Sequence, residues 1–119
     1  MITIYHNPRC SKSREALSLA EQFSARQQLP LEIIDYQKTP LTLAQLTSLH
    51  QQLGQPVSAM VRSNEAEYAT LNLAQAEDNA LLQAIADHPK LLQRPIVVYQ
   101  NRAVIGRPPE LLNALFVSP

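Results

Sequence analysis

The chain has 119 residues, which is enough for one domain with a single hydrophobic core and gives no reason to expect a second. Ten Lys and Arg residues balance ten Asp and Glu residues, which argues against the broad basic surface that nucleic-acid binding requires. The hydrophobic fraction of 45% is typical of a globular chain, and no apolar stretch approaches the roughly 20 residues of a membrane span. Only one cysteine is present, Cys10, and the N-terminal residues do not resemble a signal peptide. We therefore expect a cytoplasmic monomer without an internal disulfide or a membrane segment.

The N-terminal third of the chain predicts a strand, a helix and a second strand. Residues 2–5 are β-branched or aromatic and stop at the turn signal Asn7-Pro8. From Ser11 to about Gln28 the apolar residues recur at helical spacing. Residues 31–36 predict the second strand, and because a whole helix separates the two strands, they should be parallel.

The middle of the chain, about residues 40–90, predicts a helical insertion. Thr42 and Gln45 form a capping box, Asn64 and Glu67 a weaker one, and a further helix runs from about Asp78 to His88. The first of these helices carries Leu43, Leu46, Leu49 and Leu53, and Tyr68 and Leu71 follow the second capping box. The leucines are expected to lie in the core.

The C-terminal part predicts a β-hairpin and a helix. Residues 96–99 and 103–105 are strand-like and flank a polar turn at 100–102. Pro108-Pro109-Glu110 then opens a final helix, expected to bury Leu111, Leu112, Leu115 and Phe116. The order of elements predicts an α/β fold with a four-stranded mixed sheet covered by helices.

Cys10 lies in a loop between the first strand and the first helix, and this position favours a reactive thiol. A helix N-terminus and nearby cations lower a thiol pKa, and the loop also carries His6 and Arg14. We expect a protonated His6 to pair with the thiolate. The alternative is a buried structural cysteine, which a turn rich in Arg, Lys and Ser disfavours.

Ser13 stands where a Cys-x-x-Cys motif has its second sulfur. A thiol at Cys10 can therefore attack a substrate, but its sulfur must be regenerated by an outside thiol. The simpler alternative is that Ser13 is a first-turn hydroxyl that satisfies the backbone.

Two arginines flank the predicted hairpin. A turn centred near residue 101 places Arg94 opposite Arg107, with Cα atoms about 5 Å apart. Paired guanidinium groups repel each other but suit a tetrahedral oxyanion. If the hairpin runs antiparallel to the first strand, both arginines reach Cys10; otherwise they are solvated charges at a strand end. The three scattered histidines give no metal-binding pattern.

Three sequence motifs, in the same order along the chain, resemble those of the ArsC family of glutaredoxin-dependent arsenate reductases, in particular its short YfgD-like branch. They are residues 6–14, 94–98 and 106–110. The resemblance implies a thioredoxin-like fold with a helical insertion and a cis-proline at Pro95. It also implies that the thiolate of Cys10 attacks arsenate, that His6 lowers the thiol pKa, and that Arg62, Arg94 and Arg107 hold the oxyanion. Asn7, Ser13 and Arg14 would support the site.

The resemblance implies no bound cofactor. Glutathione would be the co-substrate and glutaredoxin the protein partner. Two alternatives stay open: a glutathione-linked oxidoreductase acting on another substrate, and a non-catalytic, Spx-like regulator that binds a protein. The chain stops at Pro119, without the C-terminal extension of longer arsenate reductases, so its physiological substrate is open as well.

Overall fold

The computed structural model describes residues 1–117 and divides the chain into two compact units. The first unit comprises residues 1–39 and the C-terminal segment from residue 94. The second comprises residues 40–93. The expectation of one domain with an insertion at about 40–90 stays a prediction.

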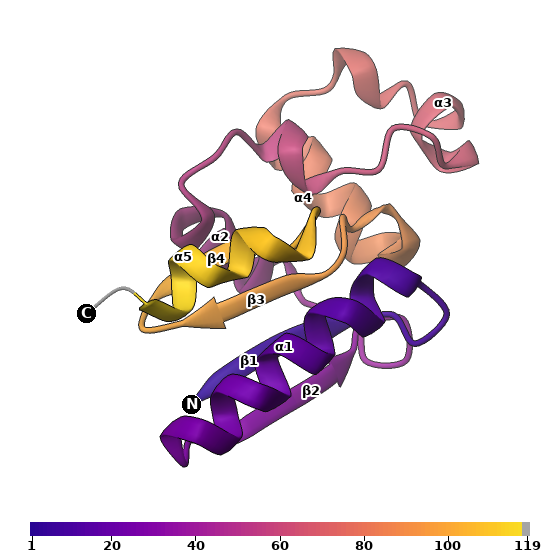
Figure 1. Ribbon diagram of the computed structural model, residues 1–119. Helices are drawn as coiled ribbons and strands as arrows, with labels where there is room; N and C mark the ends of the chain where they lie inside the picture. The colour runs from indigo at the N-terminus through magenta and orange to yellow at the C-terminus, as the bar shows by residue number, and fades with distance from the viewer. Residues whose placement is uncertain (118–119) are drawn as a thin grey trace. The chain divides into compact units, whose positions relative to one another are not determined.

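The first unit contains the sheet (Figure 1). Its strands are β1 (Ile2–His6), β2 (Leu31–Asp35), β3 (Ile96–Tyr99) and β4 (Arg102–Ile105), and their spatial order is β2-β1-β3-β4. β1 pairs in parallel with β2, while β3 pairs antiparallel with both β1 and β4. The predicted four-stranded mixed sheet and the parallel first pair are therefore confirmed.

Helices α1 (Ser11–Gln27) and α5 (Leu112–Val117) cover one face of this sheet (Figure 1). Phe23 of α1 stacks on Phe116 of α5 with ring centroids 4.4 Å apart, and Tyr99 of β3 meets Phe23 edge-on at 5.4 Å. The other buried members of this core are Ile2, Ile4, Ala16, Ala20, Val97, Leu112 and Leu115. Since each buried aromatic or aliphatic side chain contributes roughly 1.5–3 kcal/mol, this layer fixes α1 against the sheet and so fixes the position of Cys10.

The hairpin turn is one residue shorter than predicted. Gln100 and Asn101 have φ angles of 53° and 61°, and Arg102 already pairs with Tyr99 as the first residue of β4. Two successive left-handed residues are the requirement of a two-residue turn whose twist matches that of the strands. The polar side chain of Arg102 concealed the start of the strand because it directly follows the polar residues Gln100 and Asn101.

The second unit is helical. Its helices are α2 (Leu43–Leu53), α3 (Ala66–Thr70) and α4 (Asp78–Asp87), joined through short 3₁₀ turns at Val57–Met60, Leu73–Gln75 and Pro89–Leu91. The predicted capping box is present: the Gln45 amide donates to Thr42 Oγ1 (3.2 Å) and the Thr42 amide to Gln45 Oε1 (2.8 Å). Leu46, Leu49, Met60, Leu81 and Leu91 are among the buried side chains of this unit.

Several local predictions in the helical parts are wrong. Asn64 and Glu67 do not form a capping box on α3, because its N-cap residue is Glu65, which makes no side-chain capping hydrogen bond. The Glu67 carboxylate forms an ion pair with Lys90 at 3.0 Å instead. Leu43, Leu71 and Leu111 are exposed: the first lies at the first residue of α2, and the other two lie just past α3 and in the 3₁₀ turn Pro109–Leu111 before α5. Within residues 1–117, no helix has the length and apolar character needed to cross a membrane.

Candidate active site

Cys10 is the N-cap residue of α1 and closes the loop that follows β1. Its extended backbone (φ −98°, ψ 123°) turns the chain into the helix, and its carbonyl accepts the first helical hydrogen bond, from the Arg14 amide (3.0 Å). The Cys10 amide donates to the Asn7 carbonyl at 3.0 Å, which tightens the loop. The thiol therefore faces the free N–H groups of the first helical turn, where a negative charge is favoured.

The buried side chain of Ser13 stabilises the Cys10 loop through hydrogen bonds. The side chain is fully buried, and its Oγ accepts a hydrogen bond from the Asn7 amide (3.0 Å) and is hydrogen-bonded to His6 Nδ1 (2.7 Å). Ser13 thus satisfies the backbone, as the simpler interpretation of this residue expected. It also links the end of β1 to the start of α1.

Asn7 and Arg14 stabilise the outer part of the same loop. Asn7 Oδ1 accepts from the Arg9 amide (3.0 Å), and Arg14 Nη1 donates to the Pro8 carbonyl (3.0 Å). Both residues were predicted to support the site, and the structure shows how they shape the backbone around Cys10. Their part in a reaction stays a prediction.

His6 has a different partner from the one expected. Burial lowers its pKa, although the Asp35 carboxylate acts in the opposite direction, and its Nδ1 is engaged with Ser13. A buried histidine with a lowered pKa is neutral at pH 7, so the structure does not show the predicted pairing of a protonated His6 with the thiolate. The physical reason is that β1 points this side chain into the core, where it is 7% exposed.

Arg94 and Arg107 lie at the open end of the hairpin, and both side chains contact the Cys10 thiol. Arg107 Nη1 donates to Cys10 Sγ at 3.8 Å and to the Arg94 carbonyl at 3.2 Å. The Arg94–Pro95 peptide bond is cis, as expected, and so is the Arg107–Pro108 bond. The register of β1 with β3 explains this placement, because Tyr5 lies opposite Ile96 and the residues before β3 therefore lie beside the end of β1.

These surroundings lower the pKa of the Cys10 thiol. Burial alone would raise it, but the Ser13 amide, the Arg94 side chain and the Lys12 amide together outweigh that effect by favouring the thiolate. A thiol with a lowered pKa is a stronger nucleophile near neutral pH because more of it is ionised. Two guanidinium groups at the same sulfur can neutralise an anion that approaches it.

Gly106 is a residue that sequence reasoning missed. Its amide donates to the Pro95 carbonyl (2.9 Å), and a Cβ at this position would lie 3.2 Å from Pro95 Cγ and 3.5 Å from Ala16 Cβ. A side chain at this position would crowd the Pro95 ring, so glycine favours the close packing of the Arg107 segment on Pro95. One of only two glycines, placed directly before a predicted site arginine, was the available signal.

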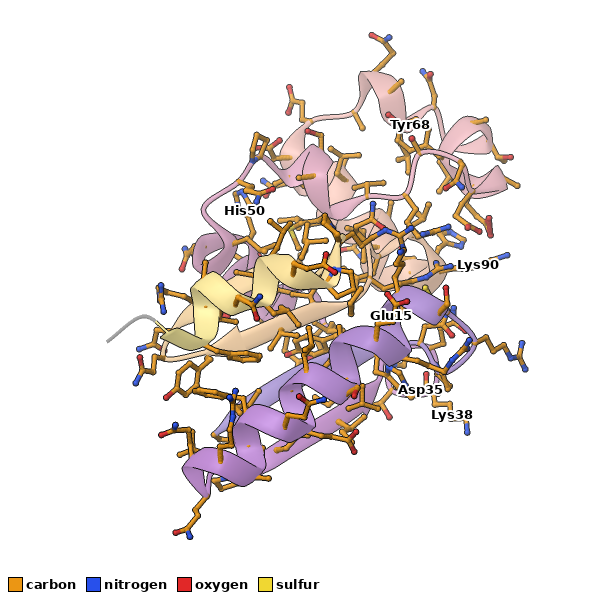
Figure 2. All side chains as sticks on the ribbon, in the orientation of Figure 1. Glu15, Asp35, Lys38, His50, Tyr68 and Lys90 are labelled. Atoms are coloured by element: carbon orange, nitrogen blue, oxygen red, sulfur yellow. The ribbon has the colours of Figure 1, made fainter. Side chains whose placement is uncertain are left out.

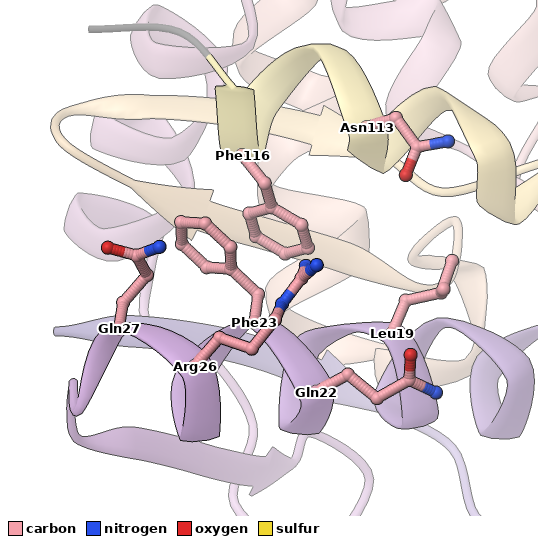
Figure 3. A pocket seen from close by; sticks show the side chains of 7 residues that line it. All are labelled: Leu19, Gln22, Phe23, Arg26, Gln27, Asn113 and Phe116. Atoms are coloured by element: carbon pink, nitrogen blue, oxygen red, sulfur yellow. The ribbon is translucent and has the colours of Figure 1, made fainter.

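A groove between α1 and α5 lies along the C-terminal half of α1 (Figure 3). Cys10 caps the same helix at its other end. The groove encloses about 320 Å³ and is lined by Leu19, Gln22, Phe23, Arg26, Gln27, Asn113 and Phe116. No nucleophile lies among these residues. In the described part of the chain, residues 1–117, no three His, Cys, Asp or Glu side chains gather as metal ligands would.

The sequence is similar to known proteins over nearly its whole length. The family model of ArsC matches residues 5–115. This chain belongs to the ArsC family. The ArsC-family relatives include a protein named arsenate reductase from Neisseria meningitidis, 43% identical over 117 residues that cover 96% of this chain and 97% of the relative. An uncharacterised protein, YfgD of Escherichia coli K12, is 45% identical over 112 residues that cover 92% of this chain and 91% of the relative.

Solved structures agree with the fold. A putative arsenate reductase from Yersinia pestis aligns with a TM-score of 0.85 and 48% identity, covering 96% of this chain and 99% of the other. The expected α/β, thioredoxin-like fold is therefore confirmed for this ArsC-family protein.

Arg62, the third arginine that the ArsC resemblance implied, lies in the second unit. Its Nε forms an ion pair with Glu65 Oε2 (3.3 Å), its Nη1 donates to Gln93 Oε1 (3.5 Å), and its amide donates to the Leu91 carbonyl (2.8 Å). The backbone and side-chain contacts hold this guanidinium in a defined position within its unit. Its role toward an anion stays a prediction.

Proposed function

We propose that this protein reduces arsenate to arsenite, with Cys10 as the nucleophile. The observation that carries the proposal is a thiol of lowered pKa, contacted by the Arg107 guanidinium, in a chain 43% identical to a protein named arsenate reductase. An activated thiolate beside two cations is the chemistry that an oxyanion substrate needs.

In the first step, the Cys10 thiolate attacks arsenic. A sulfur–arsenic bond forms and one arsenate oxygen leaves as water after taking up protons, while arsenic stays pentavalent. Arg94 and Arg107 neutralise the oxyanion and stabilise the charge that develops on the leaving oxygen, and Arg62 is proposed as the third cation.

In the second step, a glutathione thiolate attacks Cys10 Sγ. A disulfide forms between glutathione and Cys10, and the sulfur–arsenic bond breaks with its electron pair moving to arsenic, which leaves as trivalent arsenite. Glutaredoxin then takes over the glutathionyl group and restores the Cys10 thiol. One arsenate and two glutathione molecules give one arsenite, one glutathione disulfide and water.

The proposal requires glutathione as a co-substrate rather than as a bound cofactor. A compartment that keeps glutathione reduced, such as the cytoplasm, would supply it. All proposed site residues belong to one chain, so a monomer would suffice.

The test is arsenite formation by the purified protein with arsenate, glutathione and glutaredoxin. We expect turnover by the wild type and none by Cys10→Ser, whose hydroxyl has nearly the same size but is not ionised near pH 7. Normal turnover by Cys10→Ser would overturn the mechanism. If arsenate is not reduced but phosphate or sulfate protects Cys10 from alkylation, the arginine pair serves another oxyanion.

A further inference from the structure

A cavity lined mainly by polar and charged residues lies beside the Cys10 loop, on the side of β2. It encloses about 300 Å³, near the lower end of the range for small-molecule sites. Its lining residues come from the loop after β1 and from the segment that ends β2: Asn7, Pro8, Arg9, Asp35, Gln37 and Lys38. The proposed mechanism for the oxyanion uses none of the residues from the β2 side.

The cavity has a defined shape because its walls are tied to the sheet. His6 pairs with Asp35 in the parallel register of β1 and β2, so both strands end at the same edge. On one wall, Asn7 Oδ1 accepts from the Arg9 amide (3.0 Å). On the other, Asp35 Oδ1 accepts from the Gln37 amide (3.1 Å), and the Asp35 carbonyl accepts from the Lys38 amide (3.1 Å). Asp35 at the end of β2 and Lys38 just after it both line the cavity (Figure 2).

Two cations of this cavity have no anionic partner. Within residues 1–117, the side chains of Arg9 and Lys38 form neither an ion pair nor a hydrogen bond, whereas Lys12, Arg62 and Lys90 each pair with a glutamate. With Asp35 as the only carboxylate in the lining, the cavity has one positive charge in excess. Such a site favours a ligand that carries more carboxylates than ammonium groups.

The cavity and the arginine pair lie toward different strands of the sheet, and this arrangement indicates from which side the reducing thiol reaches Cys10. In the sheet order β2-β1-β3-β4, Cys10 follows β1, the cavity lies on the β2 side, and Arg94 and Arg107 lie on the β3–β4 side. Displacement at sulfur requires the entering and leaving atoms to lie on opposite sides of the sulfur. If the arginines hold the arsenic, the reducing thiol must enter from the other side.

We propose that this cavity binds a carboxylate of glutathione through Arg9 and Lys38 and so directs the glutathione thiol to Cys10. The proposal rests on the proposed function. Glutathione fits the charge of the lining, because it carries two carboxylates and one ammonium. The cavity thereby separates the site of the reductant from the site of the oxyanion.

Thiol–disulfide exchange tests the proposal without arsenate. The Cys10 thiolate attacks one sulfur of glutathione disulfide, forms the mixed disulfide and releases a glutathione thiolate. The second-order rate is compared with that for bis(2-hydroxyethyl) disulfide, which is uncharged. The ratio of the two rates isolates docking, because a change in the Cys10 pKa alters both rates alike.

We expect Arg9→Gln and Lys38→Gln each to lower this ratio about threefold, and the double variant to lower it about tenfold, the size expected for losing charge-assisted contacts at an exposed site. Arg26→Gln is the matched control, since Arg26 is also an exposed cation without an ion pair in the described chain, but it lines the α1–α5 groove. The control should leave the ratio unchanged.

Equal losses with both disulfides, or the same loss in Arg26→Gln, would overturn the proposal. During arsenate reduction, the double variant should raise the KM for glutathione and leave the KM for arsenate unchanged. If the KM for glutaredoxin rises instead, the cavity is a protein contact and the proposal is wrong. Failure of arsenate turnover in the wild type would overturn the proposed function, while the disulfide ratio would still decide whether the cavity binds glutathione.

Discussion

Arg107 Nη1 lies 3.8 Å from Cys10 Sγ, although 96 residues separate the two in the chain. Arg107 is exposed, and its Nη1 also donates to the Arg94 carbonyl (3.2 Å), which holds the guanidinium over the sulfur. One side chain therefore ties the hairpin to the N-cap of α1. The contact makes Arg107 the most direct test of the oxyanion site.

Arg107→Gln should lower kcat/KM for arsenate about 10²-fold, the usual effect of removing one donor that stabilises a developing oxyanion. Arg107→Lys keeps the charge but not the planar fork of donors, so it should recover only part of the loss. Steady-state arsenite formation measures both. Full activity of Arg107→Gln would show that this guanidinium does not contact the substrate.

The lowered pKa of Cys10 predicts the pH dependence of its alkylation. The rate with iodoacetamide should reach its plateau at lower pH than that of an unperturbed thiol, since only the thiolate reacts. Arg94→Gln should move the midpoint to higher pH, because the Arg94 side chain favours the thiolate. An unchanged midpoint in this variant would contradict the assigned cause.

The same shift predicts how stability depends on pH. Because the folded pKa of Cys10 lies below the unfolded one, the unfolded chain holds a proton that the folded protein releases between the two values. The stabilising contribution is complete above the unfolded pKa and is lost as the pH falls through the folded pKa. Urea unfolding of the wild type and Cys10→Ser at several pH values should therefore show a difference that grows as the pH rises.

Ser13→Ala should destabilise the protein by about 1–3 kcal/mol, because it leaves the buried Asn7 amide and His6 Nδ1 without their shared partner. The matched control is Ser18→Ala on the same helix, where an exposed hydroxyl accepts only from Gln22 Nε2 (3.3 Å). We expect the control to stay within about 0.5 kcal/mol of the wild type. Denaturant unfolding provides both values, and equal effects would refute the anchoring role of Ser13.

Gly106→Ala should destabilise the first unit by about 1–3 kcal/mol, since its Cβ would press on the buried ring of Pro95. The displacement should also slow alkylation of Cys10, because Pro95 adjoins Arg94. Gly54→Ala is the comparison: it has open space around the Cβ but a φ of 63°, so it should lose stability through its backbone. Its alkylation rate should match that of the wild type, and a normal rate in Gly106→Ala would contradict the proposed link to the thiol.

The sequence determined the parts of this protein that follow from local periodicity. Strand propensity in β1, apolar spacing in α1 and the capping box at Thr42 each act within a few residues, so they can be recognised without the fold. The hairpin also follows locally, because a turn near residue 101 sets the strand pairs from Tyr99–Arg102 to Ile96–Ile105. Arg107 then lies close enough to Arg94 for its Nη1 to donate to the Arg94 carbonyl (3.2 Å).

Only the tertiary structure decided what surrounds the thiol. His6 was expected to pair with the thiolate when protonated, yet its position on β1 points it into the core, where burial lowers its pKa and Ser13 becomes its partner. Asp35 and Lys38 gave no local signal at all. They lie beside the Cys10 loop because β1 and β2 are parallel and end at the same edge of the sheet. This pairing is long-range: His6 and Asp35 are neighbours in the sheet, but 28 residues separate them in the chain.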